Sequence, residues 1–346
     1  MTPLRVALLG CGASGRLWRD ALADHPSFRL RAVADLAPRA SDANAGPADP
    51  ARYDDVRLLL VEQPLDAAVV ALPPAAAESV LAVAAERGVA VLKETPVART
   101  FEDAGRLVAM FHEADVPLAV ASRWRFDRPL VERLASPHLA TIRAAVAFAS
   151  ADPGTELGWR GEAQRGGGVL RDVGYDLLDL FVALLGLPGD VTAHGGRFAA
   201  TAPDRFDAED GATLLLRYSH GAAATLTAVW RPGPVTREAV FVGSGGVLRL
   251  QPGSAEFHSD DGESLVVRPP TDADLRHAVL DQFAEAVRSR PAHYPGRAVD
   301  QLRTAAVFDA AHLSRCTHAA ESPVRVYELA GLPPPRITGR ERLAPV

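Results

Sequence analysis

Cysteine, lysine and aromatic residues are scarce in this chain of 346 residues. There are two cysteines, Cys11 and Cys316, and 6% of the residues are aromatic. Two cysteines this far apart predict neither a disulfide framework nor a cysteine metal cluster, and such sparse use is typical of a reducing compartment. No apolar run reaches the roughly 18 residues that span a bilayer. We therefore expect a cytoplasmic protein without membrane contact.

Lys93 is the single lysine among 37 basic residues, and the other 36 are arginine. Because arginine stays protonated at working pH, only Lys93 among these side chains could exchange a proton with a substrate. The alternative is that the genome favours arginine and that Lys93 is an ordinary surface residue. The net charge is −6 with mixed signs, which indicates neither a nucleic-acid-binding arm nor a membrane-surface patch.

Residues 5–15, RVALLGCGASG, join a short apolar run to three glycines spaced G-x-G-x-x-G. The apolar run is typical of a strand that is buried on both faces. Gly10, Gly12 and Gly15 would supply a tight turn, room for a diphosphate, and close contact between strand and helix. A helix over residues 14–24 would then direct its N-terminal amides at the phosphates.

A second apolar run, Leu30 to Ala34, ends at Asp35, which stands twenty residues after Gly15. An acid at this point accepts hydrogen bonds from the adenine ribose, so the combination predicts a dinucleotide site. Asp35 disfavours a 2′-phosphate and favours NAD, whereas Arg39 leaves NADP open. The alternative is a glycine-rich turn that binds nothing.

Apolar runs and helical segments alternate up to about residue 121, which predicts a doubly wound parallel sheet. The expected strands are 6–9, 30–34, 66–72, 89–92 and 117–121, and the expected helices are 14–24, 54–61, 75–87 and 100–114. Residues 37–53 read as a short interrupted helix and a loop.

From residue 138 onward the apolar runs are longer and are separated by turns, which predicts an antiparallel sheet. The expected strands are 141–149, 191–198, 212–218, 222–230, 239–242, 247–250, 255–258 and 265–268. One helix is expected at 168–185, and helices at 274–289 and 298–314 would cover the sheet or pack on the first domain. We expect domains at 1–123 and 124–330 and an extended tail at 331–346.

Several short motifs occur in one order along the chain. They are GxGxxG, Asp35, Leu72-Pro73-Pro74, Lys93-Glu94-Thr95-Pro96, Arg125-Phe126 and the run GGGVLRDVG at 166–174. In this order they resemble the glucose-fructose oxidoreductase, inositol dehydrogenase and MocA (Gfo/Idh/MocA) family, from residue 4 to about 328. The resemblance implies an N-terminal Rossmann domain for NAD or NADP, and a C-terminal α/β domain whose open sheet forms a homodimer or homotetramer.

Mapped onto this sequence, the cofactor-binding positions are Gly10, Gly12, Ala13, Ser14, Gly15, Asp35, Arg39, Leu72, Pro73, Glu94 and Pro96. The resemblance also implies three catalytic side chains: the lysine of a Glu-Lys-Pro motif, an aspartate after the triple glycine, and a histidine four residues later. Thr95 stands at the lysine and Asp176 at the histidine, while Asp172 is kept.

Hydride transfer at a carbinol carbon requires a group that takes or gives the hydroxyl proton. Thr95 is too weak an acid or base unless another group activates it. If Asp172 and Asp176 lie at i and i+4 of one helix, their repulsion would raise the pKa of one of them, and the pair could supply an acid and a base. Alternatively, Asp172 caps a helix and Asp176 is a solvated residue in a site that has lost its chemistry.

Lys93 and Tyr175 are two further candidates for the group that takes or gives the hydroxyl proton. Lys93 and Thr95 would share one face of a strand, although a cis Thr95–Pro96 bond would break this alternation. Tyr175 could donate a proton if an arginine lies near its phenol, and a packed ring is the alternative.

Three arginines and a tryptophan gather near the expected domain junction: Arg123, Arg125, Trp159 and Arg160. Because a guanidinium matches carboxylate or phosphate, they predict an anionic or polyhydroxylated small molecule; solvated arginines are the alternative. No histidine spacing predicts a metal. We expect an NAD(P)-dependent oxidoreductase of a sugar-like or cyclic polyol or its keto form. The alternative is a redox-neutral lyase or isomerase, or a silent regulatory protein, that binds the cofactor.

Overall fold

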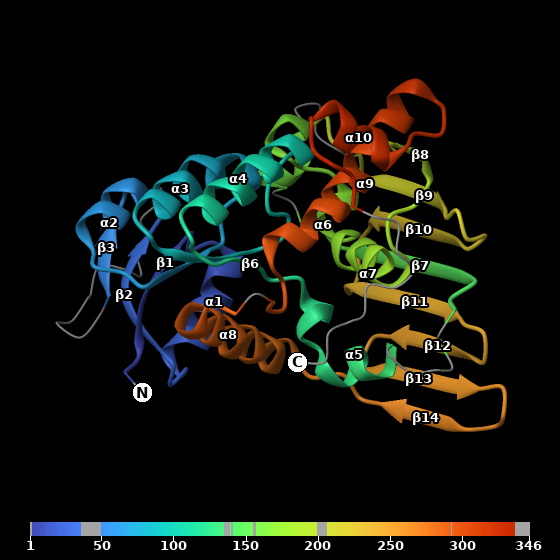
Figure 1. Ribbon diagram of the computed structural model, residues 1–346, viewed down its shortest axis with the longest axis horizontal. Helices are drawn as coiled ribbons and strands as arrows, with labels where there is room; N and C mark the ends of the chain where they lie inside the picture. The colour runs from blue at the N-terminus through green and yellow to red at the C-terminus, as the bar shows by residue number, and fades with distance from the viewer. Residues whose placement is uncertain are drawn as a thin grey trace. The chain divides into compact units, whose positions relative to one another are not determined.

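The computed structural model describes residues 2–35, 50–134, 139, 141–154, 157–198, 206–291 and 293–335. The chain forms two compact units (Figure 1). The first unit contains Met1–Arg99, Asp103–Phe126 and Pro270–Val299; the second contains Thr100–Glu102, Asp127–Pro269 and Asp300–Val346. The domain boundaries expected from the sequence, residues 1–123 and 124–330, stay a prediction.

The first unit is built on a six-stranded parallel sheet with the strand order β3-β2-β1-β4-β5-β6. The strands are β1 (Leu4–Leu9), β2 (Phe28–Ala34), β3 (Ala51–Tyr53), β4 (Ala67–Val70), β5 (Ala90–Lys93) and β6 (Leu118–Val120). The predicted doubly wound parallel sheet is confirmed. The strand order reverses between β1 and β4, and ligands of such sheets bind beyond the carboxyl ends of the strands at that point.

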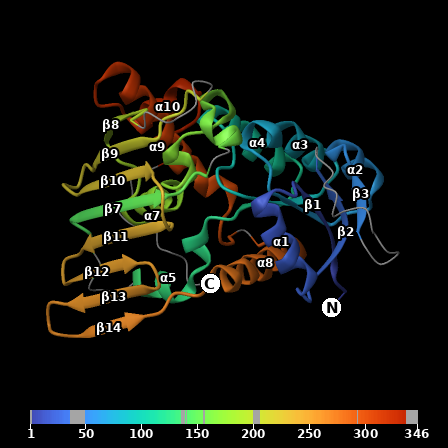
Figure 2. The ribbon, with the colours of Figure 1, turned by 180° about the vertical axis from the view of Figure 1, so that it is seen from behind.

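Helices cover both faces of this sheet (Figures 1 and 2). On one face lie α2 (Val56–Glu62), α3 (Pro74–Glu86) and α4 (Phe101–Glu113), and on the other α1 (Ala13–Ala23) and α8 (Asp272–Ser289). Because both faces are covered, the strands read as continuous apolar runs such as the fully buried β4. Although α8 is late in the sequence, it belongs to this unit, where Phe283 stacks on Phe28 at 6.1 Å.

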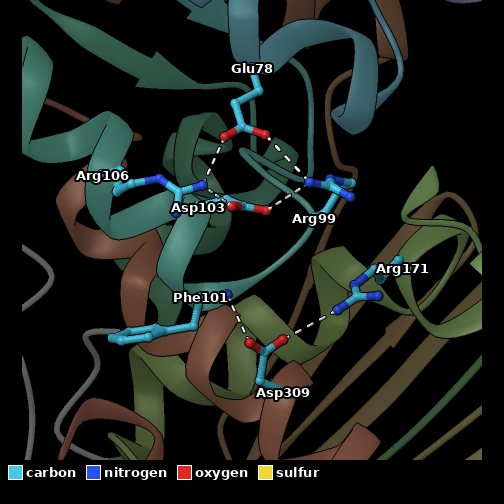
Figure 3. Close-up of polar contacts among 7 residues, drawn as sticks. All are labelled: Glu78, Arg99, Phe101, Asp103, Arg106, Arg171 and Asp309. Atoms are coloured by element: carbon cyan, nitrogen blue, oxygen red, sulfur yellow. Dashed lines mark hydrogen bonds and ion pairs between the residues drawn. The ribbon is translucent and has the colours of Figure 1, made fainter. Parts of the chain in front are cut away.

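An ionic network joins α3 to the start of α4 (Figure 3). Glu78 pairs with Arg106 at 2.9 Å and with Arg99 at 3.5 Å, and Asp103 pairs with the same two arginines. Both arginines are more than a third exposed, so solvent screening keeps each pair near or below about 1 kcal/mol. We assign this network to stability and not to the site.

The second unit is built on an eight-stranded sheet with the order β14-β13-β12-β11-β7-β10-β9-β8. The strands are β7 (Ala144–Ala151), β8 (Asp190–Gly196), β9 (Gly211–Arg217), β10 (Ala223–Trp230), β11 (Thr236–Val242), β12 (Gly246–Gln251), β13 (Ser254–Ser259) and β14 (Ser264–Val267). All neighbours are antiparallel except β7 and β10. The predicted mostly antiparallel sheet is confirmed.

One face of this sheet is covered by α6 (Val169–Asp172), α7 (Tyr175–Leu185) and α9 (Ala298–Thr317) (Figures 1 and 2). Phe181 of α7 meets Phe241 of β11 edge to face at 5.7 Å. Alternate side chains of β9 point to the covered face and are buried, as the period of a half-buried strand requires. Among the described residues no helix lies on the opposite face.

Two sequence predictions about these elements are wrong. The single helix predicted at 168–185 is two helices, since α6 ends at Asp172 and α7 begins at Tyr175. Gly174 lies at the break, and a Cβ there would be 2.8 Å from the carbonyl oxygen of Leu170. Residues 51–53 form strand β3 where a loop was predicted, because they pair with the end of β2.

None of the helices in the described ranges combines the length and the apolar character that crossing a membrane requires. Of the predicted tail 331–346, residues 336–346 lie outside the described part of the chain.

Candidate functional site

The three glycines after β1 have three different surroundings. Gly10 has a φ of +97°, and a Cβ there would lie 2.5 Å from the carbonyl oxygen of Ala71. A Cβ on Gly15 would lie 1.9 Å from the carbonyl oxygen of Gly10. A Cβ on Gly12 would meet nothing within 4 Å. Gly10 and Gly15 are therefore required by packing, while Gly12 leaves open space at the N-terminus of α1, which fits a phosphate.

Ser14 and Glu94, both predicted cofactor residues, are bonded to each other. The Ser14 hydroxyl and the Trp18 indole both donate to Glu94 Oε1, the latter at 2.8 Å. This joins the first turn of α1, which begins at Ala13, to the residue that follows β5. A carboxylate beside a helix N-terminus is stabilised by the helix dipole.

Asp35 follows β2 and is tied to the glycine loop. The backbone N–H of Cys11 donates to Asp35 Oδ2 at 2.6 Å. Leu72 lies after β4, where its Cδ2 would be 3.1 Å from a Cβ on Gly10, and Pro73 is the N-cap of α3. Arg39 lies outside the described residues.

Lys93 is the last residue of β5 and is 1% exposed. Its Nζ donates to the carbonyl oxygen of Glu94 at 2.8 Å. Burial lowers the pKa of Lys93 from 10.5 to about 8, against the attraction of Glu94. The alternative that Lys93 is an ordinary surface residue is wrong.

The Thr95–Pro96 bond is cis, as the sequence allowed. The expectation that Lys93 and Thr95 share a strand face is wrong, because β5 ends at Lys93. The relation between these two side chains therefore does not follow from strand alternation.

The glycine run of the second unit brings two segments together. Gly168 has a φ of +114°, and a Cβ there would be 2.3 Å from Glu209 Oε1. A Cβ on Gly167 would be 2.2 Å from the carbonyl oxygen of Arg160, which accepts the N–H of Gly168 at 2.9 Å. The run thus holds the short helix η4 (Gly158–Gly161) against the start of α6.

Asp172 ends α6, and both of its carboxylate oxygens accept hydrogen bonds. Arg160 Nε donates to Oδ1 at 3.0 Å, and Trp230 Nε1 donates to Oδ2 at 2.8 Å. The guanidinium carbon of Arg160 also lies 5.9 Å from the centre of the Trp159 ring. The sequence reasoning missed Trp230, because it ends a strand 58 residues away from Asp172.

The expected pairing of Asp172 and Asp176 on one helix is wrong, since α6 and α7 are separate. Asp176 lies in the first turn of α7 and is half-buried. Tyr175 is 3% exposed, and its hydroxyl donates to Gln301 Oε1 at 2.7 Å. Its ring stacks on Phe308 at 5.3 Å, so Tyr175 has the contacts of a packed ring.

A buried polar network, missed by the sequence reasoning, continues from Tyr175. Gln301 Nε2 donates to Asp179 Oδ2 at 3.4 Å, and Thr304 Oγ1 donates to Oδ1 at 2.8 Å. Asp179 has no exposed surface. Because each hydrogen bond here crosses between α7 and α9, no sequence spacing could have indicated the network.

Arg123 and Arg125 lie in η2 (Arg123–Phe126) of the first unit. Arg123 is paired with Asp272, with Nη1 to Oδ2 at 3.1 Å, and the guanidinium carbon of Arg125 is 4.8 Å from the Trp124 ring. Trp159 and Arg160 belong to the second unit. No group of acidic, histidine or cysteine side chains that could hold a metal occurs within the described ranges.

Two family models match consecutive parts of the chain. Residues 4–122 match the oxidoreductase family with an NAD-binding Rossmann fold, and residues 121–249 match the GFO/IDH/MocA C-terminal domain. A putative UDP-kanosamine synthase oxidoreductase subunit of Amycolatopsis mediterranei is 29% identical over 247 residues, which are 66% of this chain and 68% of the relative.

A D-apiose dehydrogenase of Rhizobium rhizogenes is 24% identical over 352 residues, which cover 91% of this chain and 96% of the relative. Among solved structures, levoglucosan dehydrogenase in complex with NADH and levoglucosan has a TM-score of 0.81 at 17% identity, covering 93% of this chain and 99% of that one. This structural similarity shows the fold. Together with both matched domains, it places the chain in the Gfo/Idh/MocA family of NAD-binding oxidoreductases.

Proposed function

We propose that this chain is an NAD(P)-dependent dehydrogenase or reductase that acts on a CH–OH group of a sugar-like or cyclic polyol, or on its keto form. The carrying observation is the open space at Gly12 beside the N-terminus of α1. In a family of NAD-binding oxidoreductases, open space next to this glycine fits the diphosphate of a dinucleotide. The relative named D-apiose dehydrogenase supports the substrate class.

The residues of the first unit fit the cofactor. Gly12, Ala13 and Ser14 would hold the diphosphate at the start of α1, and Asp35 would accept hydrogen bonds from the adenine ribose. We propose NAD before NADP, because the Asp35 carboxylate repels a 2′-phosphate. Bound nicotinamide supplies the hydride acceptor or donor.

We assign the proton of the substrate hydroxyl to Lys93. Lys93 is the residue before Glu94, whose carboxylate contacts the glycine loop. An amine with a pKa of about 8 is partly neutral near working pH, so it can take and return a proton. The hydroxyl of Thr95 is too weak an acid or base for this role. Because Asp172 and Asp176 lie on two separate helices, the argument that their repulsion raises the pKa of one of them no longer holds. The proton relay is therefore non-standard for this family.

We further propose a cytoplasmic homodimer or homotetramer that forms through the uncovered face of the eight-stranded sheet. Four large apolar side chains on this face are at least 40% exposed: Val146, Leu215, Val242 and Val266. Val146 lies in the register between Thr225 of β10 and Val240 of β11, at the centre of the sheet. An apolar face of this kind is typical of a protein interface.

The purified chain tests the function in two steps. Titration with NADH and NADPH, followed by tryptophan fluorescence, should show saturable binding; its absence would refute the proposal. Nicotinamide absorbance is then followed with a panel of sugars, inositols and their keto forms. Continuous turnover is the expected result, whereas binding without turnover of any substrate would favour a redox-neutral role.

A further inference from the structure

Arg160 is fixed through both its backbone and its side chain. Its carbonyl oxygen accepts the N–H of Gly168, and the missing Cβ of Gly167 lets the chains approach this closely. Its Nε donates to Asp172. A guanidinium loses much rotamer entropy on binding unless it is held beforehand, so this double attachment prepares Arg160 to bind a ligand.

Asp172 is the group that orients Arg160, and Trp230 orients Asp172. With one oxygen taken by Arg160 and the other by Trp230, the carboxylate has a fixed plane. The side chain of Asp172 is 21% exposed. The geometry therefore indicates a positioning residue, which acts on the substrate through Arg160.

The two Nη groups of the Arg160 side chain are accessible to a ligand. Within the described ranges no hydrogen bond or ion pair involves either of its Nη groups, and 39% of the side chain is exposed. The neighbouring Arg171 differs, because its Nη2 pairs with Asp309 at 3.3 Å, and Asp309 also accepts the N–H of Phe101 (Figure 3). Arg171 therefore has a structural role, whereas the Nη groups of Arg160 are accessible to a ligand.

We propose that Arg160 binds a carboxylate of the substrate, held in position by Asp172 and Trp230. This rests on the proposed dehydrogenase function and names its substrate class: a polyhydroxy acid, such as an aldonic or uronic acid. The two Nη groups form a planar pair of donors that matches the two oxygens of a carboxylate. A phosphate dianion fits less well, because the charge of Asp172 already balances that of Arg160 and would repel the second negative charge.

The test compares matched substrates that differ only in the carboxylate, such as a hexose and its uronic acid, and includes the corresponding hexose phosphate. In the wild type, kcat/KM should be highest for the acid. Arg160→Met should lower it by about tenfold or more through KM, as expected for a lost charged hydrogen bond, and should leave the hexose within about threefold.

Asp172→Asn is the positioning test. The substitution keeps the Arg160 side chain but weakens the hydrogen bond that orients it. KM for the acid should therefore rise while kcat changes little. Arg165→Met is the matched control, because Arg165 lies close by in η5 (Ala163–Arg165), is 48% exposed and pairs with Glu162. It should leave KM for both substrates unchanged. NADH affinity should match the wild type in all three variants, and Arg165→Met should also keep the wild-type thermal unfolding.

Equal losses for acid and hexose in Arg160→Met would overturn the inference, as would a wild type that prefers the neutral sugar or the phosphate. If the wild type binds NADH but turns over no substrate, the proposed function fails. Calorimetric titration of the NADH-loaded protein with glucuronate then tests the inference separately. Binding that is weakened in Arg160→Met but not in Arg165→Met supports it, and no binding to the wild type refutes it.

Discussion

Gly15 approaches the carbonyl oxygen of Gly10 so closely that a Cβ on Gly15 would lie 1.9 Å from it. The turn between β1 and α1 therefore depends on the absence of a side chain at Gly15. At Gly12, two residues after Gly10, an added Cβ would meet no atom within 4 Å, and the φ angle of −62° is ordinary for any residue. The packing role and the binding role of the loop thus lie on different glycines.

Gly15→Ala and Gly12→Ala should separate these roles. Gly15→Ala forces backbone apart, so it should lower the unfolding free energy by about 1–3 kcal/mol and also weaken NADH binding. Gly12→Ala should leave the melting temperature near that of the wild type but weaken NADH binding about tenfold or more. Calorimetry and NADH titration measure the two effects. Unimpaired NADH binding in Gly12→Ala would contradict a diphosphate at this place.

Asp35 should set the preference between NADH and NADPH. Asp35→Asn keeps an oxygen that can accept the N–H of Cys11 but removes the charge that repels a 2′-phosphate. The ratio of NADPH to NADH affinity should rise about tenfold or more. The exposed Asp24, the C-cap of α1, provides the control, since Asp24→Asn should leave the ratio unchanged. An unchanged ratio in Asp35→Asn would assign the preference to another residue.

The fold was largely predictable because its signals are local. Continuous apolar runs separated by helical segments identify the parallel sheet, and alternation identifies strands such as β9. The break between α6 and α7 was not predictable, because the helical period continues through it and one glycine is compatible with a helix. Strand β3 has three residues and exists only by pairing with β2, so it carries no pattern of its own.

The candidate site was predictable where it follows one segment and not where it joins several. The glycine loop and Asp35 are separated by a fixed βα unit, so their spacing indicates a site. Asp172, Arg160 and Trp230 come from α6, η4 and β10, and no spacing relates them. The burial of Lys93 was likewise hidden, since a single lysine at the end of an apolar run is compatible with an exposed or a buried side chain.

The uncovered face of the eight-stranded sheet should carry the subunit interface. Val146→Glu places a charge at the centre of this face, where Val146 is 56% exposed, and should convert the oligomer to monomers because burying an unpaired charge is costly. Val235→Glu is the control, since Val235 is 52% exposed but precedes β11. Analytical ultracentrifugation measures the effect. A monomeric wild type would refute the proposed assembly.

Lys93 should determine the pH dependence of turnover. If its amine takes the proton of the substrate hydroxyl, kcat/KM for oxidation should rise with pH with an apparent pKa near 8, where Lys93 loses its proton. Lys93→Met should remove this rise and lower kcat by about 100-fold or more, the usual contribution of a general base. NADH affinity serves as the control for folding. An unchanged pH profile in Lys93→Met would exclude Lys93 as the proton partner.

Lys93 should also destabilise the protein at neutral pH. Its pKa is lowered in the folded state, so the unfolded chain binds more protons between about pH 8 and 10.5, and stability contributed by this residue rises across that window. Below pH 8 the full penalty applies, which a shift of this size puts at about 3 kcal/mol. Lys93→Met removes the penalty but also the hydrogen bond to the Glu94 carbonyl, worth about 1 kcal/mol.

The variant should therefore gain about 2 kcal/mol of unfolding free energy near pH 7, and the gain should be lost as the pH rises toward and past 10.5, above which the lysine becomes neutral in both states. Urea unfolding of wild type and variant across this range measures the difference. Because Lys93 is the only lysine, no other ammonium side chain contributes to it. A variant that is less stable near pH 7 would show that the buried ammonium is compensated by its surroundings, and a pH-independent difference would contradict the lowered pKa.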